Sequence, residues 1–224
     1  MTKSEQLFEA LCASSAIRAE RVHLDRERAS DYMLWSGSSS IVIKVQQFDA
    51  HPAERTPHQP MNHSHESEVF YDCVPGERMR SKIDNAIPQF KRLSGGVRPT
   101  LLVLYDNMRL WPEICDSYAI SVAMYGIETV VVAPEVVSEA GSTMVAQWPV
   151  ASRKATSRAS TMLSGIALLS DEDGEVKMQV FHNFFAQNPI DPYLLGTKAI
   201  THYRLTENPD EGFDNWTPFA FHNS

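Results

Sequence analysis

The sequence predicts an α/β protein of the α+β type, with a mixed central sheet that is flanked by helices and extended by additional strands in the second half. Three observations carry this prediction: an amphipathic segment over residues 3–14, a strand hairpin over residues 31–48, and a fully apolar run over residues 100–105. The chain has 224 residues, 43% of them apolar, which is enough to bury one core. We therefore expect a single domain over residues 1–224.

The first half of the chain predicts a helix, three strands, a second helix and a fourth strand, in that order. Thr2 and Glu5 have the spacing of a capping box, which marks the start of the first helix. The six expected elements cover residues 3–14, 21–24, 31–35, 41–48, 76–93 and 100–105. Because strand side chains alternate, the third strand has two faces, with Ile41, Ile43 and Val45 on one and Val42, Lys44 and Gln46 on the other.

Residues 49–68 are rich in proline and histidine and lack periodicity, so we expect a long loop excursion within a core over residues 1–107, closed by a strand at 69–71. Residues 108–224 are expected to extend the sheet and to end in a tail. The expected parts are a helix near 112–125, a strand at 127–132, a looser stretch at 138–160, a hairpin of strands 161–169 and 175–181, and a surface-wrapping tail beyond Asn188.

Composition limits the classes of function. The formal net charge of −8 argues against broad coating of nucleic acid, although it leaves room for a local basic patch. The three cysteines are widely spaced, which argues against a disulfide framework or a zinc site. No apolar run approaches the roughly 20 residues that span a bilayer, and no signal-peptide pattern is seen. We expect a cytoplasmic protein without a membrane partner.

The positions of a few side chains on the predicted strands resemble a known family. Asp31 opens the second strand, and Lys44-Val45-Gln46 followed by Gln47 lies on the third. The resemblance is carried by Ser30-Asp31-Tyr32, residues 41–49, residues 76–83, residues 101–107 and Phe181-His182-Asn183. With these segments and the helix and strand order, the chain resembles a divergent member of the PD-(D/E)XK nuclease superfamily, close to a small uncharacterised family within it.

This resemblance implies a restriction-endonuclease-like αβββαβ core and metal-dependent hydrolysis of phosphodiesters. In the superfamily, an aspartate on the second strand and an acid-x-lysine triplet on the third face one cleft, where the two carboxylates hold Mg²⁺. The expected catalytic positions are therefore Asp31, Lys44 and Gln46. Lys44 replaces the metal-binding carboxylate and Gln46 replaces the lysine, so the active site is degenerate and Asp31 alone would bind a metal weakly.

Two interpretations of this degenerate site stay open. In the favoured one, Lys44 pairs with Asp31 and a salt bridge fills the former metal site. In the other, Glu9 on the first helix or Asp49 after the third strand replaces the missing ligand. The only cofactor expected is Mg²⁺, and only if the site is active.

The resemblance also places a nucleic-acid-binding face on the second helix and beside the third strand. Its expected members are Gln47, Arg78, Arg80, Lys82 and Gln89, and the alternative interpretation is an ordinary solvated helix face. Three functions follow. The first is a degenerate nuclease fold that binds nucleic acid or a protein partner. The second is an active Mg²⁺-dependent DNA or RNA endonuclease with a relocated ligand, and the third is a structural or interaction protein, as a homodimer, without a nucleic-acid role.

Overall fold

The structure of the protein is a computed structural model. It describes residues 1–22, 31–49, 76–108, 115–132, 144–149, 154–156, 159–172, 174–210 and 215–219, with side chains omitted for residues 127–132 and 144–149. The sequence prediction of a mixed α/β protein of the α+β type is confirmed. Within the described part of the chain, no helix is both long enough and apolar enough to cross a bilayer.

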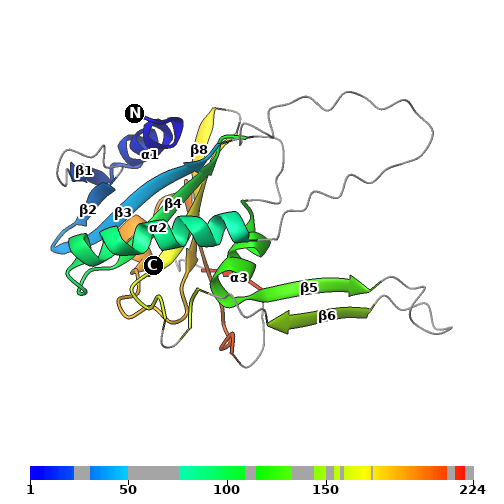
Figure 1. The fold of residues 1–224 in the computed structure, drawn as a ribbon. Helices are drawn as coiled ribbons and strands as arrows, with labels where there is room; N and C mark the ends of the chain where they lie inside the picture. Colours follow the sequence, from blue (N-terminus) through cyan, green and yellow to red (C-terminus); the bar gives the residue numbers. More distant parts are fainter. Residues whose placement is uncertain are drawn as a thin grey trace, which may run out of the picture.

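One mixed sheet of eight strands organises the described part of the chain (Figure 1). Its order is β1-β2-β3-β4-β7-β8-β9-β10. The pairs β3–β4, β4–β7 and β8–β9 are parallel, and the others are antiparallel. The strands are β1 (Arg18–Val22), β2 (Asp31–Ser36), β3 (Ser39–Phe48), β4 (Thr100–Asp106), β7 (Gly165–Glu172), β8 (Glu175–His182), β9 (Ile200–Arg204) and β10 (Thr217–Pro218).

Helices cover both faces of this sheet. Helix α1 (Lys3–Ser14) packs on one face, where Phe8 and Leu11 contact a core that includes Ile43 of β3. Helices α2 (Glu77–Ser94) and α3 (Ser117–Tyr125) pack on the other face, in a core that includes Val42. Figure 1 shows α2 crossing in front of the sheet. The alternation predicted for the third strand is therefore confirmed, and the two faces of β3 belong to two separate cores.

Local sequence signals set the ends of the helices. The capping box at α1 is confirmed, because the Thr2 hydroxyl accepts a hydrogen bond from the Glu5 amide and the Glu5 carboxylate accepts one from the Thr2 amide. Helix α3 starts at Asp116, whose carboxylate accepts a hydrogen bond from the Ala119 amide at 2.7 Å. Helix α2 lies between two glycines in the left-handed conformation, Gly76 and Gly95.

Several predicted elements need correction. The first strand spans Arg18–Val22, whereas the prediction was 21–24, whose last two residues lie outside the described part. Strand β5 (Ile127–Val132) has the predicted bounds, but it pairs with β6 (Met144–Pro149) in a separate two-stranded sheet. The tail beyond Asn188 does more than wrap the surface, since it supplies β9, β10 and the 3₁₀ helix η4 (Pro192–Leu195).

These errors share a cause, which is that strand pairing between distant segments has no local signature in the sequence. The expected excursion at 49–68, apart from Asp49, and the expected strand at 69–71 lie outside the described residues.

The packing of α2 on α3 can be tested by a substitution at Gly76. Its φ is 73°, and a Cβ atom added there would lie 2.9 Å from the Ala123 amide nitrogen. Gly95 has a φ of 60°, and a Cβ atom added at Gly95 would have no heavy atom within 4 Å. We expect Gly76→Ala to lower the free energy of unfolding by about 3 kcal/mol and Gly95→Ala by about 1 kcal/mol. Urea unfolding of both variants measures this difference, and equal losses would show that the helix contact is not tight.

Candidate functional site

The centre of the candidate site is the pair formed by Asp31 and Lys44. The antiparallel register of β2 and β3 sets these two residues directly opposite each other. The Lys44 Nζ atom lies 3.4 Å from the Asp31 Oδ1 atom, and the residues are 6% and 1% exposed. From α2, the Gln89 Oε1 atom accepts a hydrogen bond from the same Nζ atom. The side chain of Lys44 is therefore held between a carboxylate of the sheet and an amide of the helix.

Burial dominates the electrostatics of Asp31. Removal from water raises the pKa of its carboxyl group, while the Lys44 ammonium and, more weakly, the Arg92 guanidinium oppose this rise. Lys44 thus supplies the positive charge that a buried carboxylate needs. This arrangement agrees with the interpretation in which a salt bridge occupies the position that the resemblance assigns to a metal ion. In the part of the chain that the structure describes, no three His, Cys, Asp or Glu residues are grouped to hold a metal.

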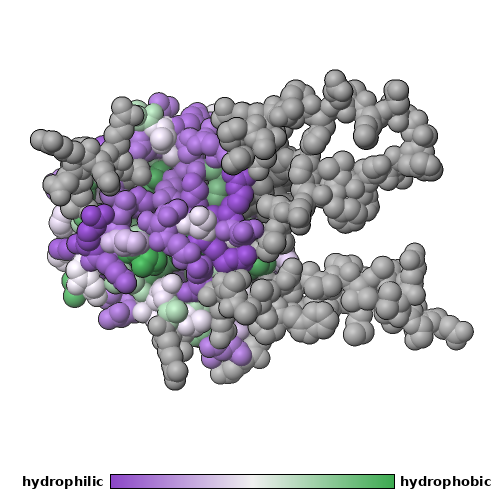
Figure 2. All heavy atoms as spheres, viewed as in Figure 1, coloured by the Kyte–Doolittle hydropathy of each residue, from purple (hydrophilic) through white to green (hydrophobic). Residues whose placement is uncertain are grey.

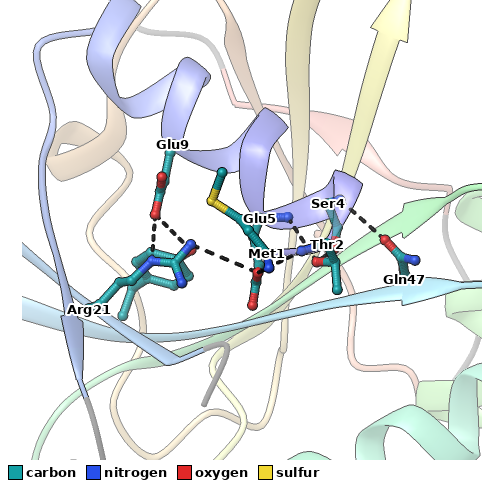
Figure 3. Close-up of polar contacts among 8 residues, drawn as sticks. Met1, Thr2, Ser4, Glu5, Glu9, Arg21 and Gln47 are labelled. Carbon is teal, nitrogen blue, oxygen red and sulfur yellow. Dashed lines mark hydrogen bonds and ion pairs between the residues drawn. The ribbon is translucent and has the colours of Figure 1, made fainter. Parts of the chain in front are cut away.

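Glu9 does not reach this pair. It projects from α1 on the opposite face of the sheet, where its carboxylate accepts hydrogen bonds from Arg21 at 2.6 Å and from the Tyr32 hydroxyl at 3.1 Å. Tyr32 neighbours Asp31 on β2 and points to the α1 face because strand side chains alternate. Figure 3 shows Glu9 and Glu5 on either side of Arg21. The sequence prediction of Glu9 as a substitute metal ligand is therefore wrong in this structure.

Asp49 is also too distant to complete a metal site with Asp31. It lies five residues beyond Lys44, a separation of about 16 Å along an extended strand, whereas ligands of one Mg²⁺ lie about 2.1 Å from the ion. Its carboxylate accepts hydrogen bonds from Gln47 at 2.8 Å and from Asn107 at 2.9 Å. Asp49 therefore belongs to the carboxyl ends of β3 and β4, and it does not rescue the site as proposed from the sequence.

The two glutamines at the end of β3 lie on opposite faces of the sheet. Gln46 shares the α2 face with Lys44, and its Oε1 atom is buried without a hydrogen-bond partner among the described residues. Gln47 points to the α1 face, where it accepts a hydrogen bond from the Ser4 amide (Figure 3). The sequence prediction grouped Gln47 with the binding residues of α2, and the alternation of the strand separates them.

Polar side chains of α2 follow β3 from its carboxyl end toward Asp31. Arg78 donates a hydrogen bond to the Asp49 carbonyl at 2.8 Å, and Lys82 donates one to the Gln47 carbonyl at 2.8 Å. Burial lowers the pKa of Lys82, and the neighbouring Arg78 and Lys44 lower it further, against the effect of Asp49. Two turns later, Gln89 meets Lys44. Three of the predicted binding residues are thus brought to one side of the helix.

Helical geometry extends this set into a polar stripe. Positions 78, 82, 85, 89 and 92 are separated by three or four residues and therefore share one face of α2. We call Arg78, Lys82, Asn85, Gln89 and Arg92 the α2 stripe. It contains no acidic residue, and Asn85 and Arg92 are exposed. Figure 2 shows a mainly hydrophilic surface on the described residues around α2. The binding face expected from the sequence did not include Asn85, although its spacing could have revealed it.

Arg80 is not part of the α2 stripe. It lies two positions from both Arg78 and Lys82, which turns its side chain about 200° away from them. The residue is only 9% exposed, and its Nη1 atom meets no hydrogen-bond acceptor in the described part of the chain. The sequence prediction of Arg80 as a phosphate-facing residue therefore fails, because every second position of a helix points to a different side.

A pair of histidines on β8 and β9, away from the Asp31–Lys44 pair, was not predicted from the sequence. His182 of β8 and His202 of β9 are joined by a hydrogen bond of 2.8 Å between Nε2 and Nδ1. Burial lowers the pKa of His182 to about 4, and the neighbouring His202 and Arg204 act in the same direction. Burial also lowers the pKa of His202 to about 4, against the Leu195 carbonyl and Asp191. Both rings are therefore neutral near pH 7.

Comparison with known proteins adds no relative: no family model, no curated protein and no solved structure matches this chain.

The buried ion pair leads to a prediction about stability. Lys44→Met leaves the Asp31 carboxylate buried without its counter-ion, so we expect the free energy of unfolding to fall by about 3 kcal/mol. Asp31→Asn combined with Lys44→Met removes both charges, and we expect a smaller loss than in the single variant. Urea unfolding at neutral pH compares the two proteins. If the double variant is the less stable of the two, the ion pair is not the main interaction at this position.

The histidine pair leads to a prediction about pH. In the unfolded chain each ring takes up a proton near pH 6.5, but in the folded chain only near pH 4. The contribution of this pair to the free energy of unfolding is therefore fully present above pH 6.5 and is lost as the pH falls toward 4. The loss is about 3 kcal/mol for each histidine. Urea unfolding between pH 7 and pH 4 measures this loss. We expect the free energy of unfolding to fall less steeply with pH in His182→Gln combined with His202→Gln than in the wild type. An equal decline would place the acid sensitivity elsewhere.

Proposed function

We propose that this protein is a nucleic-acid-binding descendant of the PD-(D/E)XK nucleases that binds the phosphate backbone without cleaving it. The observation that carries the proposal is the position of Lys44, whose ammonium group lies between Asp31 and Gln89 where a catalytic metal ion would be needed. The order of helices and strands, with Asp31 and Lys44 on neighbouring strands, supports the nuclease ancestry. A cytoplasmic location remains a prediction from the sequence.

Charge opposes catalysis at this site. Two unit charges about 4 Å apart interact by about 4 kcal/mol at an effective dielectric constant near 20. A divalent ion beside Asp31 would meet this repulsion from Lys44 for each of its two charges. It would also gain only one carboxylate, because Glu9 is held by Arg21 and Asp49 lies at the far end of β3. The alternative of an active endonuclease with a relocated metal ligand therefore has no support among the described residues.

The α2 stripe supports a nucleic-acid ligand. It carries arginine, lysine and amide side chains along residues 78–92, an axial span of about 21 Å, and so could accompany several successive phosphates. The stripe is a local feature on a chain with a net charge of −8, which favours a confined contact over general coating.

The metal site is tested by isothermal titration of Mg²⁺ and of Mn²⁺. We expect no binding to the wild type at millimolar ion concentration, because Lys44 occupies the position beside Asp31. We expect binding to appear in Lys44→Glu combined with Gln46→Lys, which restores the carboxylate and the lysine of the superfamily pattern. Asp31→Ala added to this variant is the control and should abolish the gain. Metal binding to the wild type that is lost in Asp31→Ala would refute the proposal of a filled site.

Nucleic-acid binding is tested with two neighbouring cations on α2. Arg92 lies on the stripe, whereas Lys91, one position before it, is turned about 100° away around the helix, and both are exposed. With a short single-stranded and a short duplex oligonucleotide of DNA and of RNA, we expect Arg92→Gln to weaken binding and to reduce the salt slope by about 1, while Lys91→Gln changes neither. Fluorescence anisotropy at several salt concentrations measures both quantities. No binding by the wild type at low salt would remove the nucleic-acid role and leave the structural or interaction role.

A further inference from the structure

The two ends of the eight-stranded sheet differ in how they are protected. At one end, β10 has only two residues, one of them Pro218, which cannot donate a backbone hydrogen bond. At the other end, β1 (Arg18–Val22) has five residues and no proline, and it pairs only with β2 within the described chain. Figure 1 places β1 at the margin of the sheet beside α1. Strand β1 therefore offers a row of backbone groups to a further strand.

The side chains of β1 have a particular charge pattern. Arg18 and Glu20 lie on one face of the strand, are 72% and 51% exposed, and form an ion pair of 2.5 Å with each other. On the α1 face, Arg21 is already neutralised by Glu9 at 2.6 Å and Glu5 at 3.8 Å. Ala19, between the two exposed charges, is small and only partly buried. The outer strand thus carries one exposed cation and one exposed anion, paired with each other, on either side of an alanine.

We propose that β1 is a dimer interface, pairing antiparallel with β1 of a second copy of this chain and placing Ala19 on the two-fold axis. This pairing joins the two sheets into one. It sets Arg18 of each copy directly opposite Glu20 of the other, so that each intrachain ion pair is exchanged for a cross-strand pair. The interface is isologous, as a two-fold axis requires.

Symmetry leaves few alternatives to this register. A two-fold axis perpendicular to a sheet places one residue of the strand opposite its own copy. With Glu20 on the axis, two glutamates would meet, and with Arg18 or Arg21 on the axis, two arginines would meet, each a like-charge pair that destabilises the contact. Only Ala19 gives opposite charges on both sides and a small residue at the centre. This inference is independent of the proposed function, since no residue of the α2 stripe takes part.

Disulfide trapping tests the register directly. Opposite residues of antiparallel strands have Cα atoms about 4.5 to 5.5 Å apart, which is within reach of a disulfide. We expect Ala19→Cys to form a covalent dimer under mild oxidation of the full chain. Glu20→Cys is the matched control: in this register its two copies lie about 8 Å apart, so it should stay near the wild-type background set by the native cysteines. Preferential crosslinking of Glu20→Cys, or of neither variant, would overturn the proposal.

Charge reversal tests the interaction that selects the register. In Arg18→Glu, the introduced glutamate of each copy would face Glu20 of the other copy at both pairs, and we expect the association constant of the dimer to fall by about tenfold. Arg18→Glu combined with Glu20→Arg restores opposite charges with their signs exchanged, and dimerisation should return toward the wild-type value. Sedimentation velocity over a range of protein concentrations measures the constant. A wild type that stays monomeric at every concentration, or a single variant that dimerises equally well, would overturn the proposal.

Discussion

The antiparallel register of β2 against β3 is the constraint on which the candidate site depends. It sets Asp31 opposite Lys44 and, through the alternation of side chains, sends both toward α2. The residues next to them, Tyr32 and Ile43, point to the α1 face and belong to the other core. A slip of one residue would exchange these two sets, and the charged side chains would then be buried among the apolar residues that pack against α1. The two cores therefore hold the register, and the register holds the ion pair.

The buried ion pair joins β2, β3 and α2 at one point. Desolvation raises the pKa of Asp31 and Lys44 opposes this rise, so the lysine offsets part of the cost of burying the carboxyl group. The pair persists because removing either partner alone would leave an unpaired charge. Gln89 makes this network depend on α2 as well, since the helix supplies the second acceptor for the ammonium group. Helix α2 is thus tied to the sheet by a polar contact beside its apolar one.

The surfaces that could bind partners are set by helix and strand geometry more than by total charge. The chain is acidic overall, yet the α2 stripe contains no acidic residue. Glu77 and Asp84 lie on the same helix but on other sides of it. The exposed charges of β1 are likewise balanced within one strand. A net charge of −8 therefore describes the average surface and does not predict the ligand of any one face.

The sequence by itself determined the elements whose signals are local. The capping box of Thr2 and Glu5 defined α1, and the alternation over residues 41–46 assigned Lys44 and Gln46 to one face of β3. Tertiary structure decided everything that depends on which segments meet. Glu9 faces Arg21 instead of Asp31, and Gln47 faces Ser4 instead of α2. His182 and His202 meet only because β8 and β9 pair in parallel across 20 residues. Pairing between distant strands has no short-range pattern, so only the folded chain could reveal these contacts.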